Sequence, residues 1–128
     1  MTRLIVLVAV LSACVEAEER PARWSYVYGA VLQPACTTSG CHSKLSALAG
    51  VDLSDREGAY NILTGHVCGE IAPGAPPRNY VTPGSSEYSQ LIEQLRGENR
   101  NVMPPDYPLP AVEVEMVARW IDGGAQCD

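Results

Sequence analysis

Apolar side chains recur at helical spacing in four stretches of this 128-residue chain. Side chains three or four residues apart share one face of a helix, so this spacing predicts amphipathic helices. The stretches run from Trp24 to about Gln33, from Ser54 to Leu63, from Ser85 or Ser86 to Leu95, and from Pro110 to Asp122. The alternation typical of strands is not found. The sequence therefore predicts an all-α domain of about four helices joined by long loops.

Capping and helix-breaking residues predict where these helices begin and end. Pro34 is expected to end the first helix, because proline has no backbone N–H to donate. Ser54 and Glu57 stand three residues apart, the spacing of a capping box, and predict the start of the second helix. Glycines follow the second, third and fourth helices at Gly65, Gly97 and Gly123-Gly124. Residues 66–83 are rich in Gly and Pro and are expected to form a loop.

The last two helices carry the clearest apolar stripes. We expect the third helix to bury Tyr88, Leu91, Ile92 and Leu95. The last helix is expected to turn Val112, Met116, Val117, Trp120 and Ile121 inward. Because Met116 lies within this stripe, it is interpreted as a core residue.

The start of the chain predicts export from the cytoplasm. Arg3 precedes an uninterrupted apolar run over residues 4–11, which is too short to cross a bilayer as a stable helix. Residues 1–13 are therefore interpreted as a signal peptide. They end in Leu11-Ser12-Ala13-Cys14, which resembles the lipobox of bacterial lipoproteins. The alternative is an ordinary signal peptide that has a cysteine near its cleavage site.

The lipobox resemblance implies cleavage before Cys14 and acylation of that residue. Several acyl chains on one residue give a stable membrane anchor, where a single chain is marginal. Residues 14–23 would then be the lipidated cysteine with a short linker, and residues 24–128 one small domain. The expected location is the bacterial cell envelope, facing the periplasm or the surface, with the chain anchored to a membrane by lipid.

The charge of the chain excludes one class of partner. The formal net charge is −6, and loss of residues 1–13 removes one positive charge and makes it −7. An acidic domain of this kind is not expected to bind nucleic acid through a basic face. A basic protein partner is compatible with it.

One short run, Cys36-Thr37-Thr38-Ser39-Gly40-Cys41-His42, carries the candidate chemistry. Two thiols followed directly by an imidazole are the groups that covalent haem attachment needs, with the cysteines joined to the vinyl groups and the histidine bound to iron. The usual signature has two residues between the cysteines, and this run has four. The hypothesis is one covalent haem c per chain.

The remaining cysteines predict a disulfide bond. Exported proteins rarely keep free thiols, and Cys68 and Cys127 remain once Cys14 is assigned to lipid and the other two to haem. A bond between them would close a loop of about 60 residues and stabilise the fold by about 4 kcal/mol. Two alternatives stay open. Cys36 and Cys41 could form a small disulfide ring without haem, or both could join His42 and either His66 or Cys68 in a zinc site.

A second iron ligand is expected on the other side of the haem. Met103 precedes Pro104 and Pro105 in a loop between two helices, where a methionine has no helix face to fill. The prolines restrict the backbone, which would hold the thioether in place. His66 is the alternative ligand. Candidate partners for haem propionates are Arg78, Tyr80, Arg96 and Arg100.

These pieces together resemble a class I type cytochrome c domain of exported bacterial lipoproteins. The matching segments are the helix before Cys36, the attachment run, residues 81–86, Met103-Pro104-Pro105 and residues 117–125. The resemblance implies thioether bonds at Cys36 and Cys41, with His42 as the proximal and Met103 as the distal ligand. It also implies that the first and last helices cross, with Gly29 facing Trp120.

The chain differs from this family's pattern at one further point besides the spacer. The family places a proline carbonyl downstream of the histidine to accept its second ring N–H, and no proline lies between Ser43 and Ala72. Another carbonyl is required if the imidazole is to be held in one orientation.

The function implied by the resemblance is electron transfer. A membrane-anchored monohaem c-type cytochrome would carry single electrons between redox partner proteins of the envelope and would not be an enzyme. The alternatives are a haem lipoprotein with an open iron site that acts as a sensor, and a haem-free lipoprotein that acts as an interaction module. No arrangement of serine, cysteine or carboxylate residues in the sequence suggests a hydrolase.

Overall fold

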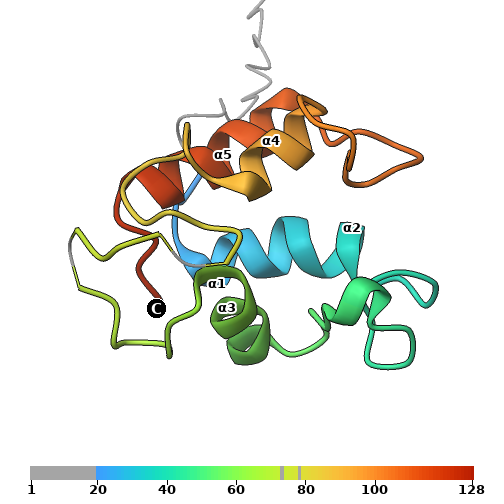
Figure 1. Ribbon diagram of the computed structural model, residues 1–128, viewed down its shortest axis with the longest axis horizontal. Helices are drawn as coiled ribbons and strands as arrows, with labels where there is room; N and C mark the ends of the chain where they lie inside the picture. Colours follow the sequence, from blue (N-terminus) through green and yellow to red (C-terminus); the bar gives the residue numbers. More distant parts are fainter. Residues whose placement is uncertain (1–19, 73, 78) are drawn as a thin grey trace, which may run out of the picture.

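The computed structural model in Figure 1 describes residues 20–72, 74–77 and 79–128. The predicted signal peptide, Cys14, most of the linker and Arg78 lie outside the described residues. Within these ranges the chain forms helices and no strand, which confirms the all-α prediction. None of the described helices is long and apolar enough to span a membrane.

The first helical segment passes through Pro34 and reaches Cys36. It consists of α1 (Trp24–Val27), a π-helical stretch η2 (Tyr28–Leu32) and α2 (Gln33–Cys36), without a break between them. The expected helix end at Pro34 is wrong. Proline lacks an N–H and its ring crowds the carbonyl four residues earlier, and a turn of wider π geometry before it accommodates both effects. Cys36 is therefore carried on the last turn of a helix.

The second helix, α3 (Arg56–Thr64), begins one residue later than the sequence pattern predicts. Its N-cap is Asp55, whose Oδ2 accepts a hydrogen bond from the Gly58 N–H at 2.8 Å. Ser54 instead donates to Asp52. The predicted capping box at Ser54 is therefore wrong. The predicted end is confirmed, because Gly65 has a φ of 72°, a conformation that favours glycine.

Helix α4 (Gln90–Arg96) also begins later than expected, after Ser89 and not at Ser85 or Ser86. The Ser89 hydroxyl donates to the Ser85 carbonyl at 2.8 Å and accepts from the Thr82 N–H at 2.9 Å, so the preceding residues form a turn. Tyr88 lies in that turn with 73% of its surface exposed, and its expected burial is wrong. Gly97 ends the helix as predicted.

Helix α5 (Ala111–Asp122) packs against α1 and α4. The core residues that it supplies are Val114, Met116, Val117, Ala118, Trp120 and Ile121. Met116 is fully buried, which confirms its assignment to the core. In Figure 1 the first helical segment lies between the α4–α5 pair and α3.

The crossing of the first and last helices is built from aromatic rings. Trp24 is fully buried, and its ring centroid lies 5.1 Å from that of Trp120 and 5.4 Å from that of Tyr60. The expected contact between Gly29 and Trp120 is wrong, because Gly29 is exposed and has open space where a side chain would stand. A large ring, and not a small residue, fills the crossing.

The C-terminal segment is held to the core by a disulfide and by hydrogen bonds. The predicted bond between Cys68 and Cys127 is confirmed, with Cα atoms 5.3 Å apart. The Tyr60 hydroxyl donates to the Ala125 carbonyl at 2.8 Å. The Ser25 hydroxyl donates to the Asp128 carboxylate at 2.6 Å. These contacts connect α1, α3 and the loop after α3 to the end of the chain.

Candidate functional site

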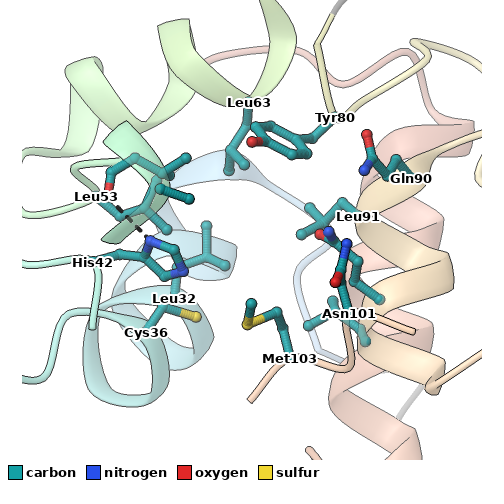
Figure 2. A pocket seen from close by; sticks show the side chains of 14 residues that line it. Leu32, Cys36, His42, Leu53, Leu63, Tyr80, Gln90, Leu91, Asn101 and Met103 are labelled. Carbon is teal, nitrogen blue, oxygen red and sulfur yellow. Dashed lines mark hydrogen bonds between the residues drawn. The ribbon is translucent and has the colours of Figure 1, made fainter. Parts of the chain in front are cut away.

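A cavity of about 280 Å³ lies beside the C-terminal end of the first helical segment. Its volume is near the lower end of the range for small-molecule sites, roughly 300–1,000 Å³. Most of its lining is apolar and comes from residues far apart in the sequence: Leu32, Ala49, Val51, Leu53, Leu63, Leu91, Leu95 and Met103. Cys36 and His42 complete this wall (Figure 2).

Two further hollows share lining residues with this cavity. A second cavity of about 50 Å³ shares Cys36, His42 and Met103 with it and adds Cys41, Leu48, Pro104 and Pro105. An open depression of about 400 Å³ shares Ala49, Val51, Tyr80 and Gln90 with the first cavity and adds Asn79. The first two cavities meet at Cys36, His42 and Met103, and the open depression lies beside the first cavity.

The imidazole of His42 is held in one orientation by the main chain. Its Nδ1 lies 3.0 Å from the Val51 carbonyl oxygen. A carbonyl oxygen only accepts hydrogen bonds, so Nδ1 carries a proton, and in the neutral ring Nε2 then keeps a free lone pair. Nε2 has no hydrogen-bond partner among the described residues and lies on the cavity side of the ring (Figure 2). Val51 thus supplies the carbonyl acceptor for the second ring nitrogen.

The backbone of His42 is fixed as well. Its N–H donates to the Cys36 carbonyl at 3.1 Å, and its carbonyl accepts from the Leu53 N–H at 2.8 Å. The Tyr28 hydroxyl in turn donates to the Leu53 carbonyl at 3.1 Å. The loop that carries the imidazole is therefore anchored to the first helical segment on both sides.

Met103 lies across the cavity from His42 (Figure 2). Its backbone N–H donates to the Gln94 carbonyl at 3.0 Å, near the C-terminal end of α4, and this carbonyl also accepts from the Gly97 N–H at 3.2 Å. The structure thus brings His42 and Met103, which are 61 positions apart in the sequence, to facing walls of one cavity. Nε2 and the thioether sulfur are both groups that bind iron in haem proteins.

Cys36 and Cys41 are both free thiols, so the alternative disulfide between them is not formed. Burial, and secondarily the neighbouring Cys41, raise the pKa of the Cys36 thiol to about 11. At neutral pH this thiol is protonated. A protonated thiol in an apolar wall is not an activated nucleophile.

The alternative zinc site also loses two of its members. Cys68 is bonded to Cys127, and His66 does not line the cavity that holds His42. Within the part of the chain that the structure describes, no group of three or more His, Cys, Asp or Glu side chains is placed to hold a metal ion. His66 is also not positioned as the second ligand opposite His42, because it does not line the cavity.

The polar part of the cavity lining is uncharged. Tyr80, Gln90, Gln94 and Asn101 line it, and no Asp, Glu, Lys or Arg does so among the described residues. Of the expected propionate partners, Tyr80 is in place. Arg96 forms an ion pair with Glu115 at 3.0 Å, and neither Arg96 nor Arg100 lines the cavity.

The cavity residues that were not expected from the sequence include Val51, Gln90, Gln94 and Asn101. Gln90 and Gln94 are one turn apart and flank the apolar stripe of Leu91 and Leu95, which is the signal that could have found them. Val51 acts through its main chain, and Asn101 through its place in a loop. Neither has a signal in the residue pattern.

Comparison of the chain with protein-family models, curated proteins and solved structures finds no match. The assignment of a function therefore rests on the geometry of this site and on the residues that form it.

Proposed function

We propose that the chain is a membrane-anchored monohaem c-type cytochrome that carries single electrons in the bacterial envelope. The observation that carries the proposal is the placement of His42 and Met103 on facing walls of an apolar cavity. Cys36 lies on the His42 side of that cavity. A Cys-Cys-His run alone predicts attachment. A thioether opposite the imidazole would supply a second iron ligand, which the run does not contain.

The described residues fit a haem in three respects. The walls are apolar, as a macrocycle requires, and the polar side chains gather at Tyr80, Gln90 and Asn101. Cys36 and Cys41 both line the second, smaller cavity, where each thiol would add across a vinyl double bond. In that addition the sulfur bonds to one vinyl carbon and the hydrogen goes to the other, so no oxidant is needed. His42 Nε2 and the Met103 sulfur would bind the iron.

Electron transfer follows from the two ligands. A haem supplies one-electron chemistry, and iron with both axial positions filled has no open site for a substrate. What the chain contributes is the apolar wall that excludes water, the fixed imidazole, and the thioether. A thioether opposite histidine gives a higher reduction potential than a second histidine would.

The same proposal includes the place of the protein in the cell. Acylated Cys14 would attach the domain to a membrane, and redox partner proteins of the envelope would exchange electrons with it. The acidic net charge favours a partner with a basic surface.

The test is to express the full chain in a bacterial host with a haem-attachment system. We expect the exported protein to gain the mass of one haem and to give a low-spin spectrum that changes reversibly on reduction. The oxidised form should show a thioether-to-iron charge-transfer band at the red end of the spectrum. A high-spin spectrum without that band would instead support the open-site sensor.

The controls separate loss of haem from loss of fold. His42→Ala should abolish the low-spin spectrum, and the paired change Cys36→Ala with Cys41→Ala should abolish covalent attachment. Far-UV circular dichroism of each variant checks that the helices remain. Wild-type protein that is correctly exported, colourless and free of iron would overturn the proposal and leave the haem-free lipoprotein.

A further inference from the structure

The four residues between Cys36 and Cys41 form a turn, and none of them lines the two cavities beside the thiols. The His42 N–H donates to the Cys36 carbonyl at 3.1 Å, although the two residues are six positions apart. In an α-helical turn the same bond joins residues four positions apart, which is the separation that a two-residue spacer would give. The backbone therefore forms the same hydrogen bond between His42 and Cys36, although the loop between them contains two more residues than a two-residue spacer would give.

The additional residues are organised by a tight turn. The Cys41 N–H donates to the Thr38 carbonyl at 3.0 Å. At the start of the turn, the Thr37 hydroxyl donates to the Gln33 carbonyl at 2.6 Å, on the last turn of the first helical segment. Thr38, Ser39 and Gly40 are exposed, so no packing from the core holds them.

Two hydroxyl groups hold the tip of this turn from the following segment. The Ser43 hydroxyl donates to the Ser39 carbonyl at 3.3 Å, and the Ser46 hydroxyl donates to the same oxygen. The Ser46 N–H and the Ala47 N–H also donate to the Ser43 carbonyl, at 3.2 and 2.7 Å. The turn and residues 43–47 therefore form one connected unit with Cys41 at its centre.

We propose that Ser43 and Ser46 are positioning residues for the second haem attachment. By holding the Ser39 carbonyl, they keep Cys41 beside the second cavity and allow a four-residue spacer to serve for attachment at two points. This inference rests on the proposed function. A longer exposed loop samples more conformations, and an unanchored Cys41 thiol would spend less time within reach of the second vinyl group.

The proposal makes the effect of the two serines depend on the length of the spacer. In Ser43→Ala with Ser46→Ala, the fraction of protein with two thioether bonds should fall relative to protein with one. The loss of one ordinary hydrogen bond corresponds to a factor of about five, so we expect a change of at least that size. Deletion of Ser39 and Gly40 gives a two-residue spacer and should leave attachment intact. In the deletion variant, the two serine changes should have no effect.

The matched control is Thr38→Ala. Thr38 is in the same exposed turn, and its hydroxyl makes no hydrogen bond within the described part of the chain. We expect wild-type attachment in this variant. The number of thioether bonds is measured by labelling the remaining free thiol in denatured protein and locating the label by peptide mass spectrometry. Equal double attachment in the serine variant and the wild type would overturn the proposal, as would an equal loss in the long- and short-spacer backgrounds.

A second measurement does not depend on haem. In chains exported without the attachment system, Cys41 of the double serine variant should react faster with a small maleimide than Cys41 of the wild type or of Thr38→Ala. Unchanged labelling of Cys41 would overturn the anchoring role. If no variant attaches haem, the proposed function fails, and the labelling rates still decide whether the serines anchor the turn.

Discussion

The Nδ1 atom of His42 lies 3.0 Å from the Val51 carbonyl oxygen, and this contact decides which ring nitrogen faces the cavity. The carbonyl holds the proton on Nδ1, so Nε2 is left as the group that can bind a metal. The acceptor belongs to the main chain of a buried residue and is therefore as rigid as the loop around it. The imidazole is oriented before any cofactor binds.

Met103 provides a direct test of the facing ligand. Met103→Ala should open one axial position and give a high-spin or ligand-labile spectrum. Met103→His should keep the low-spin spectrum but lower the reduction potential, because imidazole replaces the thioether. Both are measured by absorption spectroscopy and redox titration of the haem-loaded protein.

Met116→Leu is the matched control for Met103. Met116 is fully buried in α5 and outside the cavity lining, so this volume-conserving change should leave the spectrum and the potential as in the wild type. Unchanged oxidised and reduced spectra in Met103→Ala would remove Met103 as the ligand.

The disulfide between Cys68 and Cys127 should contribute strongly to stability. The two residues are 59 positions apart, and a cross-link over a loop of that length is worth about 4 kcal/mol in the chain-entropy model. Replacing both cysteines by alanine should lower the free energy of unfolding by about this amount in denaturant titrations. Adding reductant should produce a similar loss in the wild type and none in the double variant. Equal stability of the two proteins would contradict the prediction.

The N-cap of α3 is Asp55 in the structure, whereas the sequence pattern predicts Ser54. Asp55→Ala removes the oxygen that accepts from the Gly58 N–H and should cost about 1 kcal/mol of stability. Ser54→Ala should cost less than about 0.5 kcal/mol, because Ser54 is exposed and does not cap the helix. Asp55→Asn should restore most of the loss. Thermal unfolding of the three variants measures the difference, and the reverse order of Ser54 and Asp55 would show that the predicted capping box is the real one.

Asp128 should make part of the stability depend on acidic pH. Burial raises the pKa of Asp128. Hydrogen bonds from the Ser25 hydroxyl and N–H, together with the charge of Arg23, lower it by more, so the pKa of Asp128 lies below its ordinary value of 3.8. A carboxylate whose pKa is lowered in the folded state stabilises the fold at pH values above its pKa in the unfolded chain. This contribution to stability is lost as the pH falls through the pKa of the carboxylate in the folded protein.

Asp128→Asn and Ser25→Ala should therefore both flatten the fall in stability between about pH 5 and pH 2. Asp106→Asn is the control, because Asp106 is exposed and makes no hydrogen bond within the described ranges. Denaturant titrations across this pH range give the comparison. If both test variants lose stability with falling pH as steeply as the wild type, the Ser25–Asp128 contact is not the source of this pH dependence.

Much of the fold could be read from the residue pattern, because local signals and the final packing agree. The apolar stripe of α5 predicts the buried Met116 and Trp120, and Gly65 and Gly97 end their helices with positive φ as expected. The pairing of Cys68 with Cys127, which was predicted by assigning the other three cysteines to lipid and haem, is confirmed. The candidate ligands His42 and Met103 could also be named, since few side chains bind iron.

Other features were decided by contacts between distant segments. Ser85, Ser86 and Ser89 are all good N-cap residues, and the start of α4 follows from Ser86 bonding instead to Asp122, 36 positions away. The Val51 carbonyl had no signature, because every residue has a carbonyl and only the path of the chain brings this one to His42. The sequence thus specifies which groups are present, and the tertiary structure selects which of them meet, because the free energy of those contacts depends on neighbours that local patterns do not contain.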